Sequence, residues 1–177
     1  MKYLDLPHGN TALAIFPCSP GFGWMLFDGP LSPVRWGRSN VAKKKAASEV
    51  KNGRCLRAIE KLLHEHRPAV VVLEAFEGPG TKRGARIQAL CRSIISLAAV
   101  NGASVRVISR AQVSACLRSA ESDTRYGFAK RAASFLAEIR VRLPTERKFW
   151  KTEDPVMALF NAAVLLIVHY ANPSEPL

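Results

Sequence analysis

Ala69-Val70-Val71-Val72-Leu73-Glu74 is the stretch that decides the fold this sequence predicts, because a short apolar run ends on a carboxylate instead of a turn residue. A run of this length and composition is typical of a strand that is buried on both faces of a sheet. In open α/β sheets the chemistry lies at the carboxyl ends of such strands, which is where Glu74 stands. The loop 78–86 follows, with three glycines and three cations, and its charge predicts an anionic substrate.

Upstream of this strand, the sequence predicts an antiparallel meander of three short strands. The expected strands are residues 11–16, 22–27 and 33–37, and turn-forming residues separate them. A helix from Arg54 to Arg67 would then lead into the strand that ends at Glu74, as in a crossover connection.

Downstream, the sequence predicts one more strand and four helices. The strand is expected at 105–108, and the helices at 87–100, 112–117, 128–140 and 155–170. The whole order indicates an α/β fold in which helices flank a mixed five-stranded sheet, made of the meander plus parallel strands.

The length of 177 residues predicts one domain over 1–177, with short flexible ends at about 1–10 and 171–177. No signal-peptide core begins the sequence, and no apolar run is long enough to span a bilayer. We therefore expect a cytoplasmic protein without a membrane role. The four cysteines stand far apart, without the spacing of a zinc site, and are expected to be reduced thiols.

The charge of the sequence indicates a polyanionic partner. Lys and Arg number 26 against 14 acidic residues, for a formal charge of +12. Nucleic acid is the commonest partner of so positive a surface. The candidate phosphate-binding residues are Lys82, Arg83, Arg86, Arg110, Arg125, Lys130 and Arg131. For each of them, a solvated surface side chain is the alternative.

The acidic pair before the last expected helix allows two interpretations. Asp154 can cap the helix with Pro155 at its first position, and Glu153 and Asp154 both suit the positive end of the helix dipole. The same pair can instead supply carboxylates to a site that contains Glu74. On the inner face of this helix, Ala158 and Ala162 are small enough to let it approach a sheet closely.

These segments, taken in order, resemble the RNase H-like fold of RuvC-type Holliday junction resolvases. Ile15-Phe16-Pro17-Cys18-Ser19, followed by Gly21-Phe22-Gly23, is similar to the family's first strand and turn, usually Ile-Asp-Pro-Gly-Ser and then Gly-Tyr-Gly. Val72-Leu73-Glu74 resembles the second catalytic strand, and 161–169 resembles the last helix, which usually opens Asp-Ala. The resemblance covers roughly 11–170.

The resemblance implies phosphodiester hydrolysis by two Mg²⁺ ions about 4 Å apart, held by clustered carboxylates. The candidate catalytic residues are then Glu74, Glu153, Asp154 and Asn161, and the candidate ligands of Mg²⁺ or Mn²⁺ are Glu74, Asp154 and Asn161. However, Phe16 stands at the position of the first aspartate and has no ligand atom. Asn161 stands at the position of the last aspartate and offers only a neutral carbonyl oxygen.

The sequence therefore predicts a RuvC-like protein that binds nucleic acid, namely branched or structured DNA such as four-way junctions, with impaired or lost nuclease activity. One alternative is an active Mg²⁺-dependent junction endonuclease with an incomplete carboxylate set. Another is a structural or regulatory subunit that uses the same face to bind protein. The resemblance also implies a homodimer. Non-catalytic roles stay open as well: core packing for Phe16, a helix-face hydrogen bond for Asn161, and an ion pair with Lys82 or Arg83 for Glu74.

Overall fold

A computed structural model describes residues 11–41, 46–118, 123–148 and 151–172, and its centre is a five-stranded sheet in the order β3-β2-β1-β4-β5. The strands are β1 (Ala12–Cys18), β2 (Gly21–Gly29), β3 (Ser32–Asn40), β4 (Val70–Glu74) and β5 (Ser104–Ile108). The first three pair antiparallel, whereas β4 is parallel to both β1 and β5. The expected mixed five-stranded sheet is confirmed.

β4 is a buried central strand, as its apolar run predicts. It lies between β1 and β5, and Val71, Val72 and Leu73 are fully buried because helices cover both faces of the sheet. Its register pairs Glu74 with Ile108 at the carboxyl edge of β5. The carboxylate therefore emerges where the parallel strands end.

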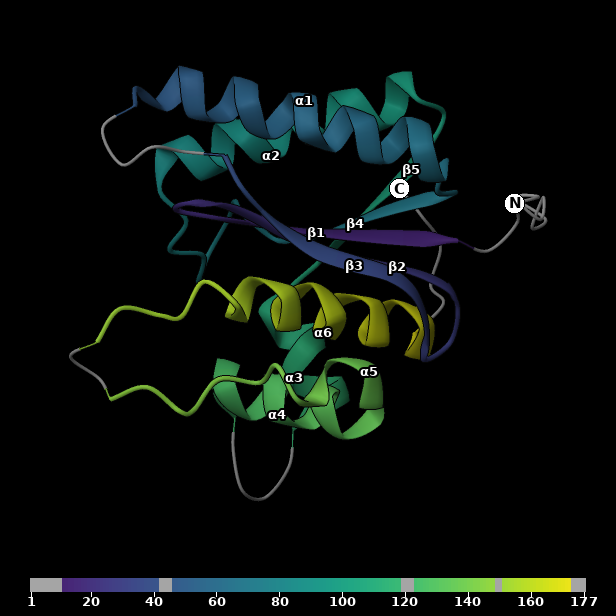
Figure 1. The fold of residues 1–177 in the computed structure, drawn as a ribbon, viewed down its shortest axis with the longest axis vertical. Coiled ribbons are helices and arrows are strands. Elements are labelled where there is room, and N and C mark those ends of the chain that lie inside the picture. The colour runs from purple at the N-terminus through teal and green to yellow at the C-terminus, as the bar shows by residue number, and fades with distance from the viewer. Residues whose placement is uncertain (1–10, 42–45, 119–122, 149–150, 173–177) are drawn as a thin grey trace.

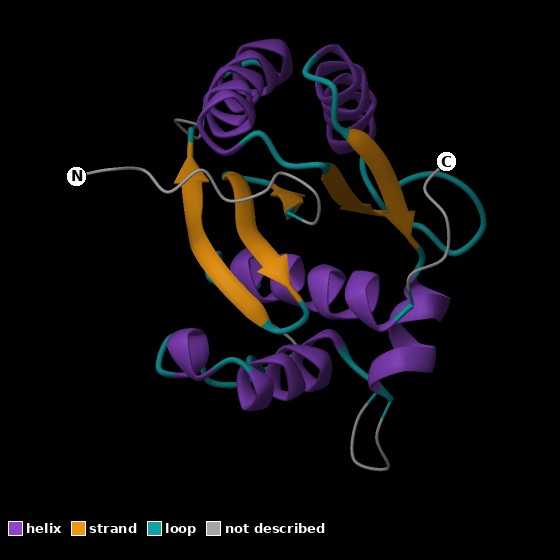
Figure 2. Cartoon of the chain, turned by 90° about the vertical axis from the view of Figure 1, so that its right-hand side faces the viewer, coloured by secondary structure: helices purple, strands orange, loops and turns teal. Residues whose placement is uncertain are grey.

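The helices form layers on the two faces of the sheet. α1 (Ser48–His66) and α2 (Ala85–Val100) cover one face, and α6 (Met157–Ala171) covers the other (Figure 1). α3 (Arg110–Leu117), α4 (Arg125–Phe135) and α5 (Ala137–Arg140) lie beyond α6, and a view turned by 90° shows the same layers (Figure 2). The side chains of β1 alternate between the two faces: Leu13 and Ile15 pack toward α1 and α2, and Ala14 packs toward α6.

α6 is buried on all sides over residues 157–168, because the sheet lies on one side of it and α3 and α4 pack on the other. It approaches β2 so closely that a Cβ atom at Gly23 would lie 2.3 Å from the carbonyl carbon of Ala158. The small residues expected on this face therefore meet a glycine on the strand. Among the helices of the described ranges, none is both long and apolar enough to cross a membrane.

Several helix boundaries differ from the sequence prediction, and α2, α3 and α4 each begin two or three residues earlier than expected. α1 begins at Ser48, six residues before Arg54, because its exposed first turns carry no apolar periodicity. The single helix expected over 128–140 is instead two, α4 and α5, which meet at the buried Leu136.

α6 begins at Met157, two residues after Pro155. The backbone N–H groups of residues 157–159 each donate to the carbonyl three positions earlier, at residues 154–156, and so form a tight turn that leads into the helix. The expected flexible ends lie largely outside the described residues, except that Ala171 ends α6 and the carbonyl of Asn172 accepts a hydrogen bond from Arg106.

Candidate functional site

A groove of about 1090 Å³ opens at the carboxyl end of β4. Its walls come from the end of β1, the loop between β4 and α2, the starts of α3 and α4, and Glu153 before α6. Four candidate phosphate-binding residues line it, namely Lys82, Arg83, Arg110 and Arg125. Both Glu74 and Glu153 line it too, so the fold brings these two predicted carboxylates into one groove.

Glu74 is held by two arginines. Its Oε2 atom accepts a hydrogen bond from Nη2 of Arg83 and another, at 3.1 Å, from Nη2 of Arg125. Only 10% of the Glu74 side chain is exposed. Two guanidinium groups therefore neutralise one carboxylate and leave a surplus positive charge.

The same two guanidinium groups lie over the ring of Phe16. The distance from the Cζ atom to the ring centre is 4.3 Å for Arg83 and 5.3 Å for Arg125. At such distances the negative face of the ring attracts the cations. Phe16 thus does more than pack in the core: with Glu74, Arg83 and Arg125 it forms a compact group, called here the Glu74 cluster.

Arg83 is fixed by further contacts. Its Nη1 atom donates to the carbonyl of Pro17 at 3.0 Å, and the side-chain amide of Gln88 donates to the Arg83 carbonyl at 2.9 Å. The loop that follows β4 is therefore tied both to β1 and to the first turns of α2.

Arg86 is used mainly to hold neighbouring segments together. Its guanidinium donates to the carbonyls of Cys18 and Ser19, at 3.0 and 3.2 Å, and to the side chain of Asn52 at 3.0 Å. These bonds join α2 to the β1–β2 turn and to α1. The predicted phosphate-binding role of Arg86 therefore competes with a structural one.

Arg110 stands between the groove and a second pocket. Its Cζ atom lies 4.8 Å from the centre of the buried Phe128 ring, and its Nη2 atom donates to the carbonyl of Asp123 at 3.3 Å. Burial, and next the charge of Arg125, lower the pKa of Arg110. This shift reflects how closely the guanidinium groups gather on this side of the groove.

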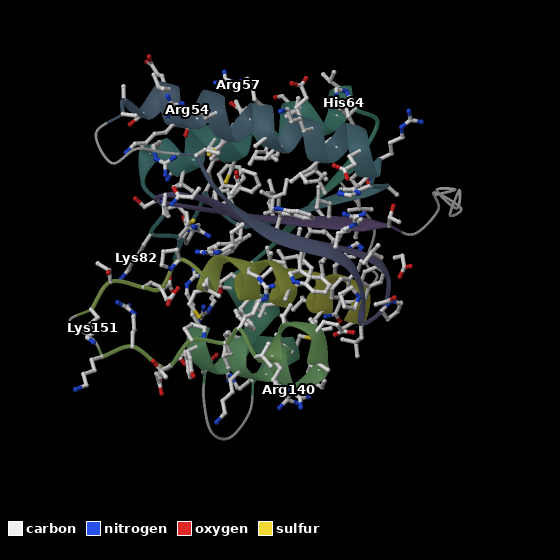
Figure 3. The ribbon with its side chains drawn as sticks, in the orientation of Figure 1. Arg54, Arg57, His64, Lys82, Arg140 and Lys151 are labelled. Carbon is white, nitrogen blue, oxygen red and sulfur yellow. The ribbon has the colours of Figure 1, made fainter. Side chains whose placement is uncertain are left out.

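Lys130 and Arg131 lie elsewhere, on the exposed side of α4, and do not line the groove. Figure 3 shows how widely the cations are spread: Arg57 lies on α1 in one outer layer, and Arg140 lies on α5 in the opposite layer. The positive charge of the chain is thus not confined to the groove. The groove is, however, where Arg83 and Arg125 converge on the carboxylate of Glu74.

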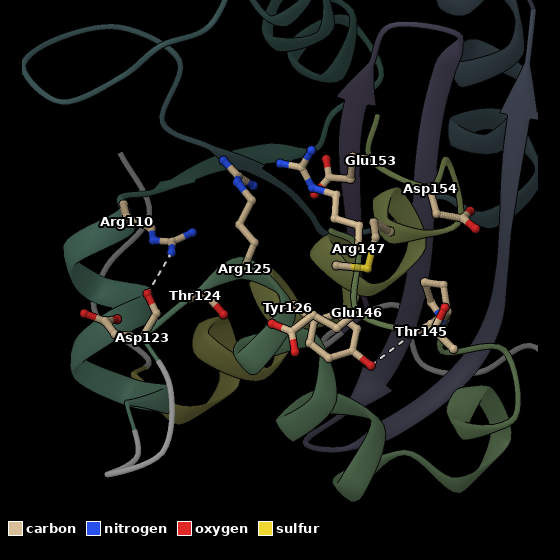
Figure 4. A pocket seen from close by; sticks show the side chains of 12 residues that line it. Arg110, Asp123, Thr124, Arg125, Tyr126, Thr145, Glu146, Arg147, Glu153 and Asp154 are labelled. Carbon is tan, nitrogen blue, oxygen red and sulfur yellow. Dashed lines mark hydrogen bonds between the residues drawn. The ribbon is translucent and has the colours of Figure 1, made fainter. Parts of the chain in front are cut away.

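The second pocket, of about 480 Å³, adjoins the groove and shares Arg110, Arg125 and Glu153 with it (Figure 4). Asp154 lines this pocket and not the groove. One of its side-chain oxygens accepts a hydrogen bond from the backbone N–H of Val156 at 2.8 Å. Asp154 therefore stabilises the turn before α6, whereas the expected role as N-cap of the helix is wrong: the N-cap residue is Val156, and no side chain of the described residues caps the helix.

Asn161 lies within the buried stretch of α6 and lines neither of these two hollows. Its residue exposure is 6%, and within the described part of the chain its Nδ2 atom has no hydrogen-bond partner. The four candidate catalytic residues thus do not form one site. Glu74 and Glu153 line the groove, Asp154 lines the second pocket together with Glu153, and Asn161 is buried in the core.

The donor set around Glu74 does not fit Mg²⁺ or Mn²⁺. These hard cations need several oxygen ligands, preferably charged. Here the carboxylate of Glu74 holds two guanidinium groups, which would repel a cation, and Phe16 supplies no oxygen. Over the described residues, no three His, Cys, Asp or Glu side chains gather closely enough to hold a metal ion.

Sequence reasoning missed the contact between Arg125 and Glu74, which joins residues 51 positions apart. It also missed the contact of Phe16 with two cations. One sequence signal pointed to that contact: Phe16 stands where the resemblance places an aspartate, and the basic loop 78–86 follows the central strand. The pairing of Glu74 with Arg83, one of the roles left open by the sequence, is present.

No family model matches this sequence, and neither does any curated protein. Two solved structures of Thermus thermophilus RuvC match the fold with a TM-score of 0.66 each, and one of them is a complex with a Holliday junction substrate. Their sequences are 17% and 16% identical to this one, and the matches cover 95% and 94% of this chain and 99% of each RuvC chain. The chain thus has the RNase H-like fold of the RuvC resolvases over nearly its whole length, as its sequence predicts.

Proposed function

We propose that this protein binds branched or structured DNA, such as a four-way junction, in the groove at the carboxyl end of β4, and that it does so without metal-dependent cleavage. The observation that carries the proposal is the Glu74 cluster. Where the RuvC resemblance implies carboxylates that hold metal ions, this chain has one carboxylate bound to Arg83 and Arg125, which lie over Phe16.

The charge of the groove supports the binding part of the proposal. Four cations and three carboxylates line it. One of these carboxylates, Glu77, is paired with Arg92, which lies on α2. Phosphate contacts by Lys and Arg supply most of the affinity of proteins for DNA, and the chain as a whole carries a formal charge of +12.

The fold supports DNA as the polyanion. One of the two RuvC structures, which matches 95% of this chain, contains a Holliday junction substrate. A groove in the equivalent fold, lined by arginines, fits the same class of ligand.

The chemistry of the groove supports the loss of cleavage. Two-metal hydrolysis needs ions that activate water and stabilise the leaving oxygen. Arg83 and Arg125 can bind a phosphate, but a guanidinium at neutral pH cannot generate hydroxide from water, because it is already protonated and cannot accept the proton that the water would lose. A protein with this cluster is expected to hold DNA and leave it intact.

The test is a pair of measurements on the wild-type protein. Fluorescence anisotropy compares its affinity for a four-way junction and for a linear duplex of the same arm sequence over a range of salt concentrations. We expect tighter binding to the junction, with a loss of about 10³-fold between about 50 and about 200 mM salt if about six phosphates are contacted. Incubation of the same junction with Mg²⁺ or Mn²⁺ is expected to yield no cleavage on a denaturing gel.

Two results would contradict the proposal in different ways. Absence of binding at low salt would remove the DNA-binding role and favour the protein-binding alternative. Cleavage that depends on Mg²⁺ and is lost in Glu74→Gln would instead establish an active endonuclease with an incomplete carboxylate set.

A further inference from the structure

We infer that Arg83 and Arg125, held by Glu74 against the Phe16 ring, bind one backbone phosphate of the DNA in place of metal ions. This inference rests on the proposed function and deepens it, because it names the group of the DNA that the Glu74 cluster recognises. It further requires that binding be independent of Mg²⁺.

The first support is convergence. Nη2 of Arg83 and Nη2 of Arg125 both donate to the same oxygen of Glu74, and both guanidinium carbons lie within 5.3 Å of the Phe16 ring centre. Two guanidinium groups that meet at one point present their remaining N–H donors to a shared region of the groove. Oxygen-rich anions such as phosphate match such a pair of forks.

The second support is charge. The Glu74 cluster has two cations and one anion, so it keeps a net positive charge after its internal ion pairs are counted. Arg110 also lines this groove, close enough for the charge of Arg125 to lower its pKa. A phosphate at the cluster would therefore meet a positive potential from three side chains.

The third support is that donors remain. Within the described part of the chain, the side chain of Arg125 makes one hydrogen bond, from its Nη2 atom to Glu74. A guanidinium carries five N–H donors. The side chain of Arg125 is 37% exposed and lines the groove, so its other donors can reach a ligand there.

The fourth support is preorganisation. Arg83 is also bonded to the Pro17 carbonyl. Arg125 is the first residue of α4, whose N-cap Thr124 accepts a hydrogen bond from the N–H of Gly127 at 3.0 Å. Because the two arginines are already ordered, a phosphate that binds them has little side-chain entropy left to remove.

The competing explanation is a purely structural clamp that ties the loop after β4 and the start of α4 to the sheet. The two explanations differ in what salt does to DNA binding. Loss of one phosphate contact lowers the slope of log K against log salt concentration by about 0.9, whereas loss of a structural contact leaves the slope unchanged.

The experiment measures that slope for the wild type, Arg125→Gln and Arg57→Gln on junctions of two unrelated sequences. Arg57 is the matched control, because it is an exposed arginine on α1, across the sheet from α4 (Figure 3). We expect Arg125→Gln to lower the slope by up to about 0.9, because Arg83 still contacts the same phosphate, and to weaken binding equally for both sequences; Arg57→Gln should change neither. Urea unfolding of each variant shows that the protein assayed is folded.

Phe16→Leu provides a second variant that keeps all charges. It removes the ring on which the guanidinium groups lie, and we expect weaker binding with the salt slope retained, because the cations are present but less well placed. Wild-type affinity is expected to be no lower in EDTA than in Mg²⁺.

The outcomes separate the two claims. A wild-type protein that does not bind DNA at low salt overturns both. A wild-type protein that binds, with a slope that Arg125→Gln leaves unchanged or with an affinity that rises on addition of Mg²⁺, overturns this inference alone.

Discussion

The Cζ atom of Arg83 lies 4.3 Å from the centre of the Phe16 ring, so a cation rests on an aromatic side chain at the position where RuvC-type resolvases are expected to have an aspartate. An aspartate there would attract metal ions, whereas the phenylalanine offers no oxygen ligand and stabilises guanidinium groups through its ring face. The consequences of this exchange can be measured in the stability of the protein.

Replacement of Phe16 by leucine should cost more than an ordinary loss of aromatic packing. Phe16 is 4% exposed, and its ring contacts two guanidinium groups. Phe22 is the matched control, because it is equally buried in the neighbouring strand. We expect the free energy of unfolding in urea to fall by about 1 kcal/mol more for Phe16→Leu than for Phe22→Leu. Equal losses of unfolding free energy in the two variants would show that the contact between the guanidinium groups and the Phe16 ring does not stabilise the fold.

Replacement of Glu74 by glutamine should destabilise the fold, because the largely buried guanidinium group of Arg83 and the partly exposed one of Arg125 would lose their carboxylate. We expect a loss of about 1–3 kcal/mol in the free energy of unfolding. Glu77→Gln is the control: it removes a carboxylate of the same groove whose ion pair with Arg92 is half-exposed, and such pairs contribute about 0–1 kcal/mol. A Glu74 variant as stable as the Glu77 variant would contradict the expectation that Glu74 holds the two arginines in place.

A methyl group at Gly23 should disturb the packing of α6 on the sheet. Its Cβ atom would lie 2.3 Å from the carbonyl carbon of Ala158, which is backbone and cannot rotate away. We expect Gly23→Ala to lower the free energy of unfolding by about 3 kcal/mol. Gly29→Ala is the matched control in the same strand, since no atom lies within 4 Å of its new methyl group, and a change within about 0.5 kcal/mol is expected there. Comparable losses at both positions would mean that close approach of α6 is not the cause.

Mild acid should weaken the attachment of the α6 C-terminus. Burial, and then the charge of Arg106, lower the pKa of His169, whose Nδ1 atom lies 3.0 Å from Nη1 of Arg106. The unfolded chain therefore binds the proton more readily than the folded protein. The stability from the neutral ring is fully present above about pH 6.5 and is lost as the pH falls from there toward the lower pKa of the folded state.

Urea unfolding at about pH 7.5 and about pH 5.5 tests this expectation. His169→Gln should reduce the difference in unfolding free energy between the two pH values, whereas the exposed His64→Gln should not. His66, whose pKa is also lowered by burial, keeps part of the difference in every variant. An unchanged difference in His169→Gln would show that this ring does not titrate with unfolding.

The parts of the fold that the sequence predicts well are those set by local patterns. The apolar run 70–73 can hardly be anything but a buried strand, and its direction in a crossover unit places Glu74 at the carboxyl edge. The start of α1 was missed because Ser48 to Gly53 are polar or exposed and are helical without an apolar stripe to show it.

The candidate site was harder to predict, because its contacts join distant parts of the chain. No local pattern indicates that Arg125, at the start of α4, reaches the carboxylate at the end of β4. Sequence spacing also cannot distinguish a groove residue from a core residue on a helix that is buried all round, which is why Asn161 was grouped with Glu74 although it lies within α6.

The position of α6 has a consequence for biosynthesis. This helix follows all the other described elements in chain order, yet it lies between the sheet and the layer of α3 to α5. Until residues 157–171 have left the exit tunnel, the apolar faces of β1 and β2 on one side and of α4 on the other have nothing to pack against. Nascent chains that stall before α6 should therefore aggregate or recruit chaperones, and protease resistance of this fold should arise only once α6 has emerged.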